Sequence, residues 1–264
     1  MIMLWAFLRR DFQIASSYRT SLLLAIAGGL FTLTAFHFLA QMVGAAPMLQ
    51  AYGADYFSFA LLGLAVASAL RSLQTNFAMR LRESQADGSL EILLLAPVST
   101  FRVIVCLAGF SVLSGLAKAL SFLVFGAWFF HARLSINLAA FSLTFVLAML
   151  PFAALGLFSA AVVLVLKRSD PFTYALDTAT YLLCGVLYPV ELLPSSLRWV
   201  AKVLPATHAL EALRAAGLRH APLEQLLPSW GRLILFAAVL WPLAALALAF
   251  ARRHVERTGT LPHG

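Results

Sequence analysis

The chain has 264 residues, of which 62% are hydrophobic and only 11% are charged. An ordinary soluble domain is about 45–50% apolar and about 25% charged, so this composition excludes one and indicates a membrane protein. The net charge of +8 would suggest nucleic acid for a soluble chain, but in an apolar chain Lys and Arg are expected to mark the cytoplasmic edges. Cys106 and Cys184 both lie in apolar runs, which gives no disulfide or metal framework. We therefore expect an all-α polytopic membrane protein with no metal site and no nucleic-acid partner.

Residues 1–20 have the pattern of an amphipathic helix. Apolar side chains such as Leu4, Phe7 and Leu8 recur at helical spacing, and Arg9 and Arg10 fall on the other side. A helix of this kind lies in the membrane surface, in contact with lipid, and does not cross it. We predict an N-terminal interface helix over 1–20.

Six apolar runs then follow that are long enough to be spans. A helix needs about 20 apolar residues to cross about 30 Å of hydrocarbon. The expected spans are 21–43, 56–79, 103–130, 137–166, 172–190 and 229–251. The sequence thus predicts a six-span domain over 21–251 and a tail over 252–264.

Basic residues alternate between the connections of these spans. They gather in 1–20, 80–102, 167–168 and 252–264, whereas 44–55 and 131–136 contain only Arg133. Because positive residues stay on the cytoplasmic side, both termini are expected to be cytoplasmic. We expect a multi-pass protein of the cell membrane, and a bacterial inner or plasma membrane fits best.

The connection 80–102 contains a polar stretch followed by a short apolar helix. Gly88 breaks the chain, Asp87 or Ser89 can cap the helix, and Pro97 ends it. Glu91 in its first turn complements the helix dipole. Its apolar ridge of Leu90, Leu93 and Leu94 has no core of its own, so this helix is expected to need a partner.

The segment 191–228 has a different pattern, with mixed charges and several prolines. Residues 197–204 and 209–216 are predicted to be two short amphipathic helices, each too short to span. We predict a re-entrant hairpin that enters the membrane from the outer face between the fifth and sixth spans.

The sequence lacks the common nucleotide-binding and metalloprotease motifs. It contains no G-x-x-x-x-G-K-[ST] phosphate loop, no dinucleotide glycine fingerprint and no H-E-x-x-H. We expect that this chain binds no cofactor and does not hydrolyse ATP by itself.

Two blocks resemble the membrane subunit of a type-2 ATP-binding-cassette (ABC) exporter. The first is Arg82-Glu83 followed by GSLEILLLAPVS at 88–99, similar to that family's cytoplasmic segment before the third span. The second is GVLYPVELLP at 185–194 with LPATHALEALR at 204–214, similar to the end of the fifth span and the outer re-entrant helices.

The resemblance implies that 88–97 is a coupling helix that docks on a separate ATPase, which binds ATP and magnesium. Two ATPase copies and a second permease copy, as a homodimer or heterodimer, are implied as partners. The implied docking residues are Arg82, Glu83, Asp87, Gly88, Leu90, Glu91, Leu93, Leu94 and Pro97. The implied hairpin residues are Pro189, Glu191, Pro194, Pro205 and Glu211.

Three charged residues fall inside the predicted spans: Arg71, Lys118 and Asp177. A charge at mid-bilayer costs about 2.5–3.5 kcal/mol on insertion scales, so each is expected to face protein or water. Counted along the helices, Arg71 lies ~14 Å and Asp177 ~10 Å from the cytoplasmic ends. We predict an Arg71–Asp177 ion pair between the second and fifth spans. Lys118, ~22 Å from its cytoplasmic end, can snorkel, pair or contact substrate.

The sequence therefore predicts an exporter permease but does not identify its substrate. The apolar spans favour an amphipathic, lipid-linked or drug-like substrate. Polysaccharide or glycolipid export is the alternative within the same superfamily. An integral-membrane enzyme or scaffold is the alternative from another class, and the enzyme would require paired carboxylates, a histidine cluster or a metal motif. A secondary transporter would require an internal repeat, which the two halves do not visibly share.

Overall fold

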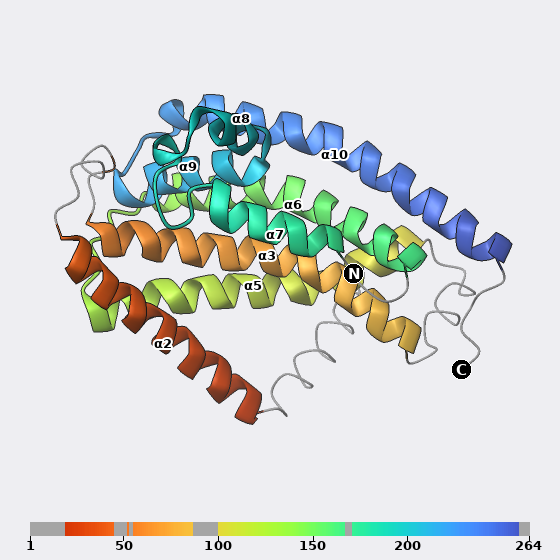
Figure 1. The fold of residues 1–264 in the computed structure, drawn as a ribbon, viewed down its shortest axis with the longest axis horizontal. Helices are drawn as coiled ribbons and strands as arrows, with labels where there is room; N and C mark the ends of the chain where they lie inside the picture. Colours follow the sequence, from red (N-terminus) through yellow and green to blue (C-terminus); the bar gives the residue numbers. More distant parts are fainter. Residues whose placement is uncertain (1–18, 45–51, 53–54, 87–99, 167–170, 259–264) are drawn as a thin grey trace.

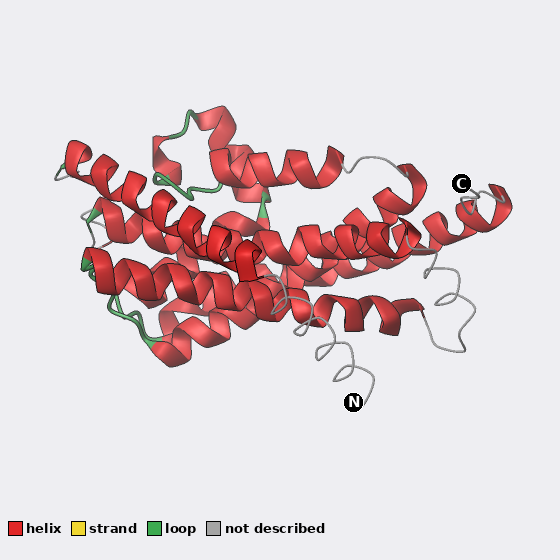
Figure 2. Ribbon diagram, turned by 90° about the horizontal axis from the view of Figure 1, so that it is seen from below, coloured by secondary structure: helices red, strands yellow, loops and turns green. Residues whose placement is uncertain are grey.

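The structure is a computed structural model that describes residues 19–44, 52, 55–86, 100–166 and 171–258. The regular elements in these ranges are all helical (Figures 1 and 2). They are α2 (Arg19–Val43), α3 (Tyr56–Ala86), α5 (Thr100–Phe130), α6 (Leu138–Leu166), α7 (Pro171–Leu183), η2 (Val190–Leu192), α8 (Ser195–Val203), α9 (Pro205–Leu218) and α10 (Leu223–Thr258). The predicted coupling helix at 88–97, and all but the last two residues of the predicted interface helix, lie outside the described residues.

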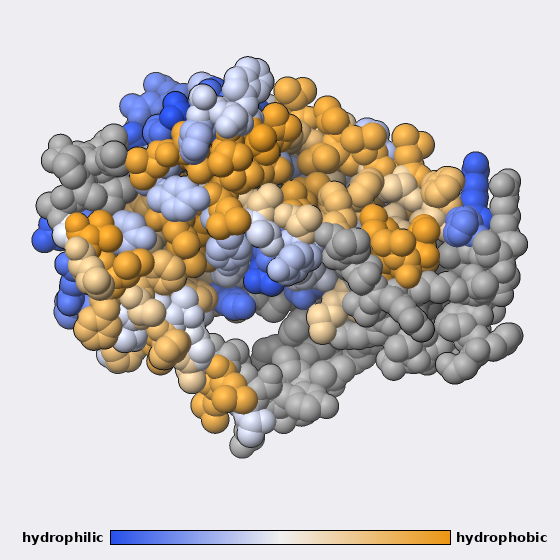
Figure 3. All heavy atoms as spheres, viewed as in Figure 1, coloured by the Kyte–Doolittle hydropathy of each residue, from blue (hydrophilic) through white to orange (hydrophobic). Residues whose placement is uncertain are grey.

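Helix α3 runs through the centre of the bundle (Figure 1). It packs against α5 and α6, and α10 packs on α6, while α9 fills the space bounded by α3, α6 and α10. Most of α3 between Phe57 and Leu73 is buried. By contrast, α2 and α10 expose many large apolar side chains, and Figure 3 shows an apolar face over much of the molecule. Exposed apolar surface on this scale is typical of contact with lipid or a partner chain.

Among the described residues, four stretches are long and apolar enough to cross a membrane: Ile26–Val43, Tyr56–Asn76, Leu138–Leu166 and Leu223–Ala251. Helix α5 contains a shorter apolar stretch, Gly115–Phe130. These helices support an integral membrane protein with several spans.

The predicted fifth span is wrong in its extent. A single helix was expected over 172–190, but α7 has 13 residues and ends at Leu183. At 1.5 Å per residue it is about 20 Å long, which is less than the hydrocarbon thickness. The chain leaves the helix around Gly185, whose φ of +79° is accessible to glycine with little strain.

The boundaries of the last helix also differ from the prediction. Helix α10 begins at Leu223, before the expected start at 229, and continues to Thr258. It therefore includes the first residues of the predicted tail. Pro228 and Pro242 both lie inside it, so the proline at 228 does not mark the end of the hairpin segment.

The connections that the sequence assigned to the outer side meet at one end of the bundle. The backbone N–H of Ser135 donates to the Gly217 carbonyl at 3.0 Å, and that of Asn137 donates to the Ala216 carbonyl at 2.9 Å. The N–H of Arg133 donates to the Ser58 hydroxyl at 2.9 Å. We call this end, formed by residues 131–137, η2, α8 and α9, the hairpin end; it lies at the left in Figure 1.

Candidate functional site

The broken end of α7 is held by one buried arginine of α9. Arg214 donates through Nη1 to the Gly185 carbonyl at 2.6 Å and through Nη2 to the Val186 carbonyl at 2.8 Å. Nη2 also lies 3.3 Å from the Phe59 carbonyl, and the guanidinium carbon lies 3.5 Å from the centroid of the Phe59 ring. The residue is only 3% exposed. We call this arrangement the hairpin latch; it joins α3, the end of α7 and α9.

The latch requires a glycine on α3. A Cβ built at Gly63 would overlap the Val186 carbonyl oxygen and Nη2 of Arg214. Only a residue without a side chain lets the irregular chain after α7 approach the α3 backbone this closely. Gly63 therefore fixes where the latch can form.

The sequence did not identify Arg214 as a functional residue. It predicted an amphipathic helix over 209–216, but α9 is buried on all sides except at Glu211. The prediction was wrong because α9 is enclosed by α3, α6 and α10. The available signal was a lone arginine in a helix rich in Ala, Leu and Gly, which indicates a buried cation that needs acceptors. By contrast, α8 is amphipathic, and its Trp199 is 75% exposed.

The predicted hairpin prolines occupy element boundaries. Pro189 precedes η2, Pro194 precedes α8, and Pro205 is the first residue of α9. Proline suits these positions because its missing N–H would have no helical partner there. They set the corners of the hairpin and contribute no reactive group.

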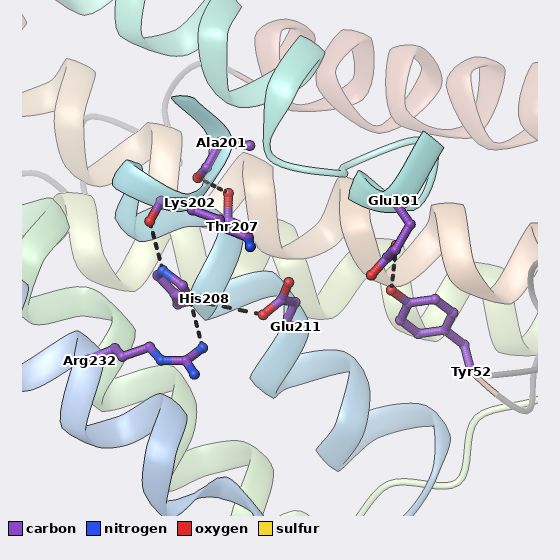
Figure 4. Close-up of polar contacts among 8 residues, drawn as sticks. All are labelled: Tyr52, Glu191, Ala201, Lys202, Thr207, His208, Glu211 and Arg232. Carbon is purple, nitrogen blue, oxygen red and sulfur yellow. Dashed lines mark hydrogen bonds and ion pairs between the residues drawn. The ribbon is translucent and has the colours of Figure 1, made fainter. Parts of the chain in front are cut away.

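The two predicted hairpin carboxylates lie in two separate polar clusters near the hairpin end (Figure 4). Glu211 approaches Nδ1 of His208 at 3.9 Å, and Arg232 approaches the same nitrogen at 3.4 Å. Nε2 of His208 lies 2.9 Å from the Lys202 carbonyl; because that oxygen can only accept, Nε2 carries the proton. The Tyr52 hydroxyl lies 3.5 Å from Oε2 of Glu191.

Burial controls the ionisation of one group in each cluster. Burial raises the pKa of Glu211, and Glu191 adds to the shift, while His208 and two arginines oppose it. Burial also raises the pKa of Tyr52, with Glu191 as the next cause. No metal-binding cluster occurs among the described residues.

The structure brings Arg71 and Asp177 together, as their predicted depths require. Nε of Arg71 on α3 lies 3.2 Å from Oδ2 of Asp177 on α7. The Arg71 side chain is 53% exposed and that of Asp177 only 14%. Lys118 on α5 is exposed, and it forms no ion pair with the rest of the described chain.

Two of the predicted docking residues fall in the last turns of α3. Arg82 and Glu83 lie on a helix that continues to Ala86, seven residues past the predicted end of the span at 79. This extension adds about 10 Å. The other docking residues (Asp87, Gly88, Leu90, Glu91, Leu93, Leu94 and Pro97) lie outside the described part of the chain.

A comparison with protein families gives one match. The family model for the ABC-2 type transporter matches residues 2–218, which includes α2 to α9 and the segment 87–99. A comparison with curated proteins returns no match. Because the match covers well over half of the chain, the protein belongs to the ABC-2 type transporter family, whose membrane subunits are permeases that depend on a separate ATPase subunit.

Proposed function

We propose that this chain is the permease subunit of an ABC exporter and forms the path for an amphipathic substrate. The observation that carries the proposal is the family match over 2–218. It covers both the segment proposed to dock the ATPase and the hairpin held by the latch. Two ATPase subunits bind ATP and magnesium, and two permease copies enclose the path.

The coupling helix at 88–97 is the proposed contact with the ATPase. Its apolar ridge enters a groove on the ATPase, and the flanking charges Arg82, Glu83, Asp87 and Glu91 set the register. Electrostatic complementarity of this kind contributes to specificity more than to affinity. The ridge would otherwise remain exposed to water next to the membrane.

Helix α3 is the proposed transmission element. Residues 56–86 form one continuous helix of 31 residues, about 46 Å long. It leads directly to the coupling segment, carries Arg71 partway along, and takes part in the latch at Phe59 and Gly63. A movement of the coupling helix would thus be transmitted to α7 and to the hairpin through these two connections.

The apolar faces of α2 and α10 are exposed in the single chain. Lipid and a second permease copy would cover these faces. Residues 23, 24 and 31 of α2 expose large apolar side chains, as do residues 235, 246 and 250 of α10. In this arrangement both termini are cytoplasmic and the hairpin end faces outward. The second copy is identical or a paralogue.

Co-purification with the ATPase tests the docking. We expect Glu91→Lys and Leu94→Asp each to abolish co-purification and the stimulation of ATP hydrolysis by the permease. Matched controls are Glu224→Lys and Leu192→Asp, which make the same changes at exposed positions of the first turn of α10 and of η2. Unchanged co-purification and stimulation in both docking variants would contradict the proposal.

A further inference from the structure

Two cations, Arg71 and Lys118, lie near the point where α3 and α5 cross. A Cβ at Gly115 would lie 3.1 Å from the Ala69 carbonyl oxygen and 3.1 Å from Cβ of Ser72, so the two helices touch at this point. Arg71 lies between these two α3 residues in sequence, and Lys118 lies about one turn after Gly115 on α5. With 3.6 residues per turn and antiparallel helices, both side chains project toward the side of the α3–α5 pair on which α2 lies.

Helix α2 leaves the bundle next to these cations. Leu33 is buried against α3 and α5, and a Cβ at Gly29 would be 3.9 Å from the Phe122 ring. Toward the start of the helix, Leu23 and Leu24 are exposed. Figure 1 shows α2 diverging from α3 and α5 in this direction, and Figure 3 shows a hollow there, with hydrophilic side chains beside it on an apolar face.

The charges of the described residues at this opening do not balance. Asp177 compensates one of the two cations through its contact with Arg71. Lys118 has no carboxylate partner in the described part of the chain, so these three residues leave one positive charge. Neighbouring hydroxyls do not compensate it, because Ser121 donates to the Lys118 carbonyl at 2.7 Å and Thr75 to the Arg71 carbonyl at 3.0 Å.

The cations lie below the outer headgroup layer. Arg71 is 15 residues from the start of α3 and Lys118 is 12 residues from the end of α5. These spacings correspond to about 22 Å and about 18 Å below the hairpin end, within hydrocarbon about 30 Å thick. An anion that reaches them from the outer side must be brought into the membrane by the protein.

We propose that the opening between α2, α3 and α5 binds an amphiphile with a phosphate headgroup, held between Arg71 and Lys118, with its acyl chains beside α2. This proposal rests on the proposed function and names the class of its cargo. The net positive charge favours an anionic headgroup, and the apolar helices around the opening favour acyl chains. Arg71 remains accessible while it contacts Asp177, so one phosphate can bridge the two cations.

Binding of fluorescent phosphatidic acid to the full-length permease in nanodiscs of zwitterionic lipid tests the site. We expect Lys118→Gln to weaken binding about tenfold, which is what loss of one charged hydrogen bond produces. Lys202→Gln, which removes an exposed lysine of α8 at the hairpin end, should bind as the parent does. Diacylglycerol with the same chains should bind weakly to all three proteins, because it lacks the phosphate.

Three results would overturn the proposal. The first is unchanged binding of phosphatidic acid by Lys118→Gln, and the second is equal binding of phosphatidic acid and diacylglycerol by the parent. The third is competition by inorganic phosphate at the same concentration as phosphatidic acid, which would show a site for the free anion.

A fourth possible result concerns the oligomeric state of the permease. If Lys118→Gln abolishes the dimer, measured by light scattering, Lys118 pairs with the second copy, and the proposal is overturned. Because binding is measured without the ATPase, failure of the docking experiment leaves this result intact. Conversely, normal docking with no loss of binding in Lys118→Gln overturns only the cargo assignment.

Discussion

Replacing Arg214 by methionine tests the hairpin latch most directly. Methionine has a similar length and stays apolar, so the change removes the charge and the donors without leaving a large cavity. The carbonyls of Gly185, Val186 and Phe59 then lose the guanidinium, as does the ring of Phe59. We expect the hairpin end to separate from α3 at lower temperature than in the parent.

The size of the effect follows from the number of acceptors. An unsatisfied buried acceptor costs about 1–3 kcal/mol, and charged contacts of this kind are stronger than neutral ones. Since one local rearrangement relieves several acceptors, the costs do not add fully, and we expect about 3–5 kcal/mol. For a chain of this size, each kcal/mol shifts the melting temperature by about 2–4 °C. A loss of at least about 6 °C is therefore expected.

The assay is thermal unfolding of the purified permease in detergent, followed by the loss of the monodisperse peak in size-exclusion chromatography. Arg133→Met is the matched control, because Arg133 is an exposed arginine at the same end of the bundle. It should melt within about 2 °C of the parent. If Arg214→Met also melts within about 2 °C, the three carbonyls have other partners and the latch does not stabilise the fold.

The other predictions concern the latch glycine, the Glu211 carboxyl and the Arg71–Asp177 pair. Gly63→Ala should destabilise the protein by about 1–3 kcal/mol through overpacking. The control Gly231→Ala, with open space around its Cβ, should be neutral or stabilising by up to about 1 kcal/mol. Equal melting temperatures of the two variants would refute the close approach at Gly63. Because burial raises the pKa of Glu211, its contribution to stability is most favourable at low pH and declines as pH rises from the unfolded value through the folded pKa. The melting temperature of Glu211→Gln should therefore fall less steeply with pH over this range than that of the parent. Identical slopes would exclude the effect. Arg71→Asp and Asp177→Arg should each lower the yield of assembled permease, the double variant should recover it, and failure of recovery would show that the pair contributes nothing specific.

The sequence by itself determined the class of the protein and much of its secondary structure. Long apolar runs specify α2, α3, α6 and α10 because a helix in lipid satisfies its own backbone, so its existence depends on local composition alone. The depths of Arg71 and Asp177 also follow from counting along the helices, since the rise per residue is fixed. The family resemblance followed from the same local patterns.

Only the tertiary structure decided where the fifth helix ends and what holds it. A run of apolar residues over 172–190 does not reveal that the helix stops at Leu183, because the interruption depends on a donor for the freed carbonyls. That donor is Arg214, 29 residues from Gly185 and 155 from Phe59. Periodicity describes one helix at a time, whereas the satisfaction of buried polar groups depends on residues that folding brings together.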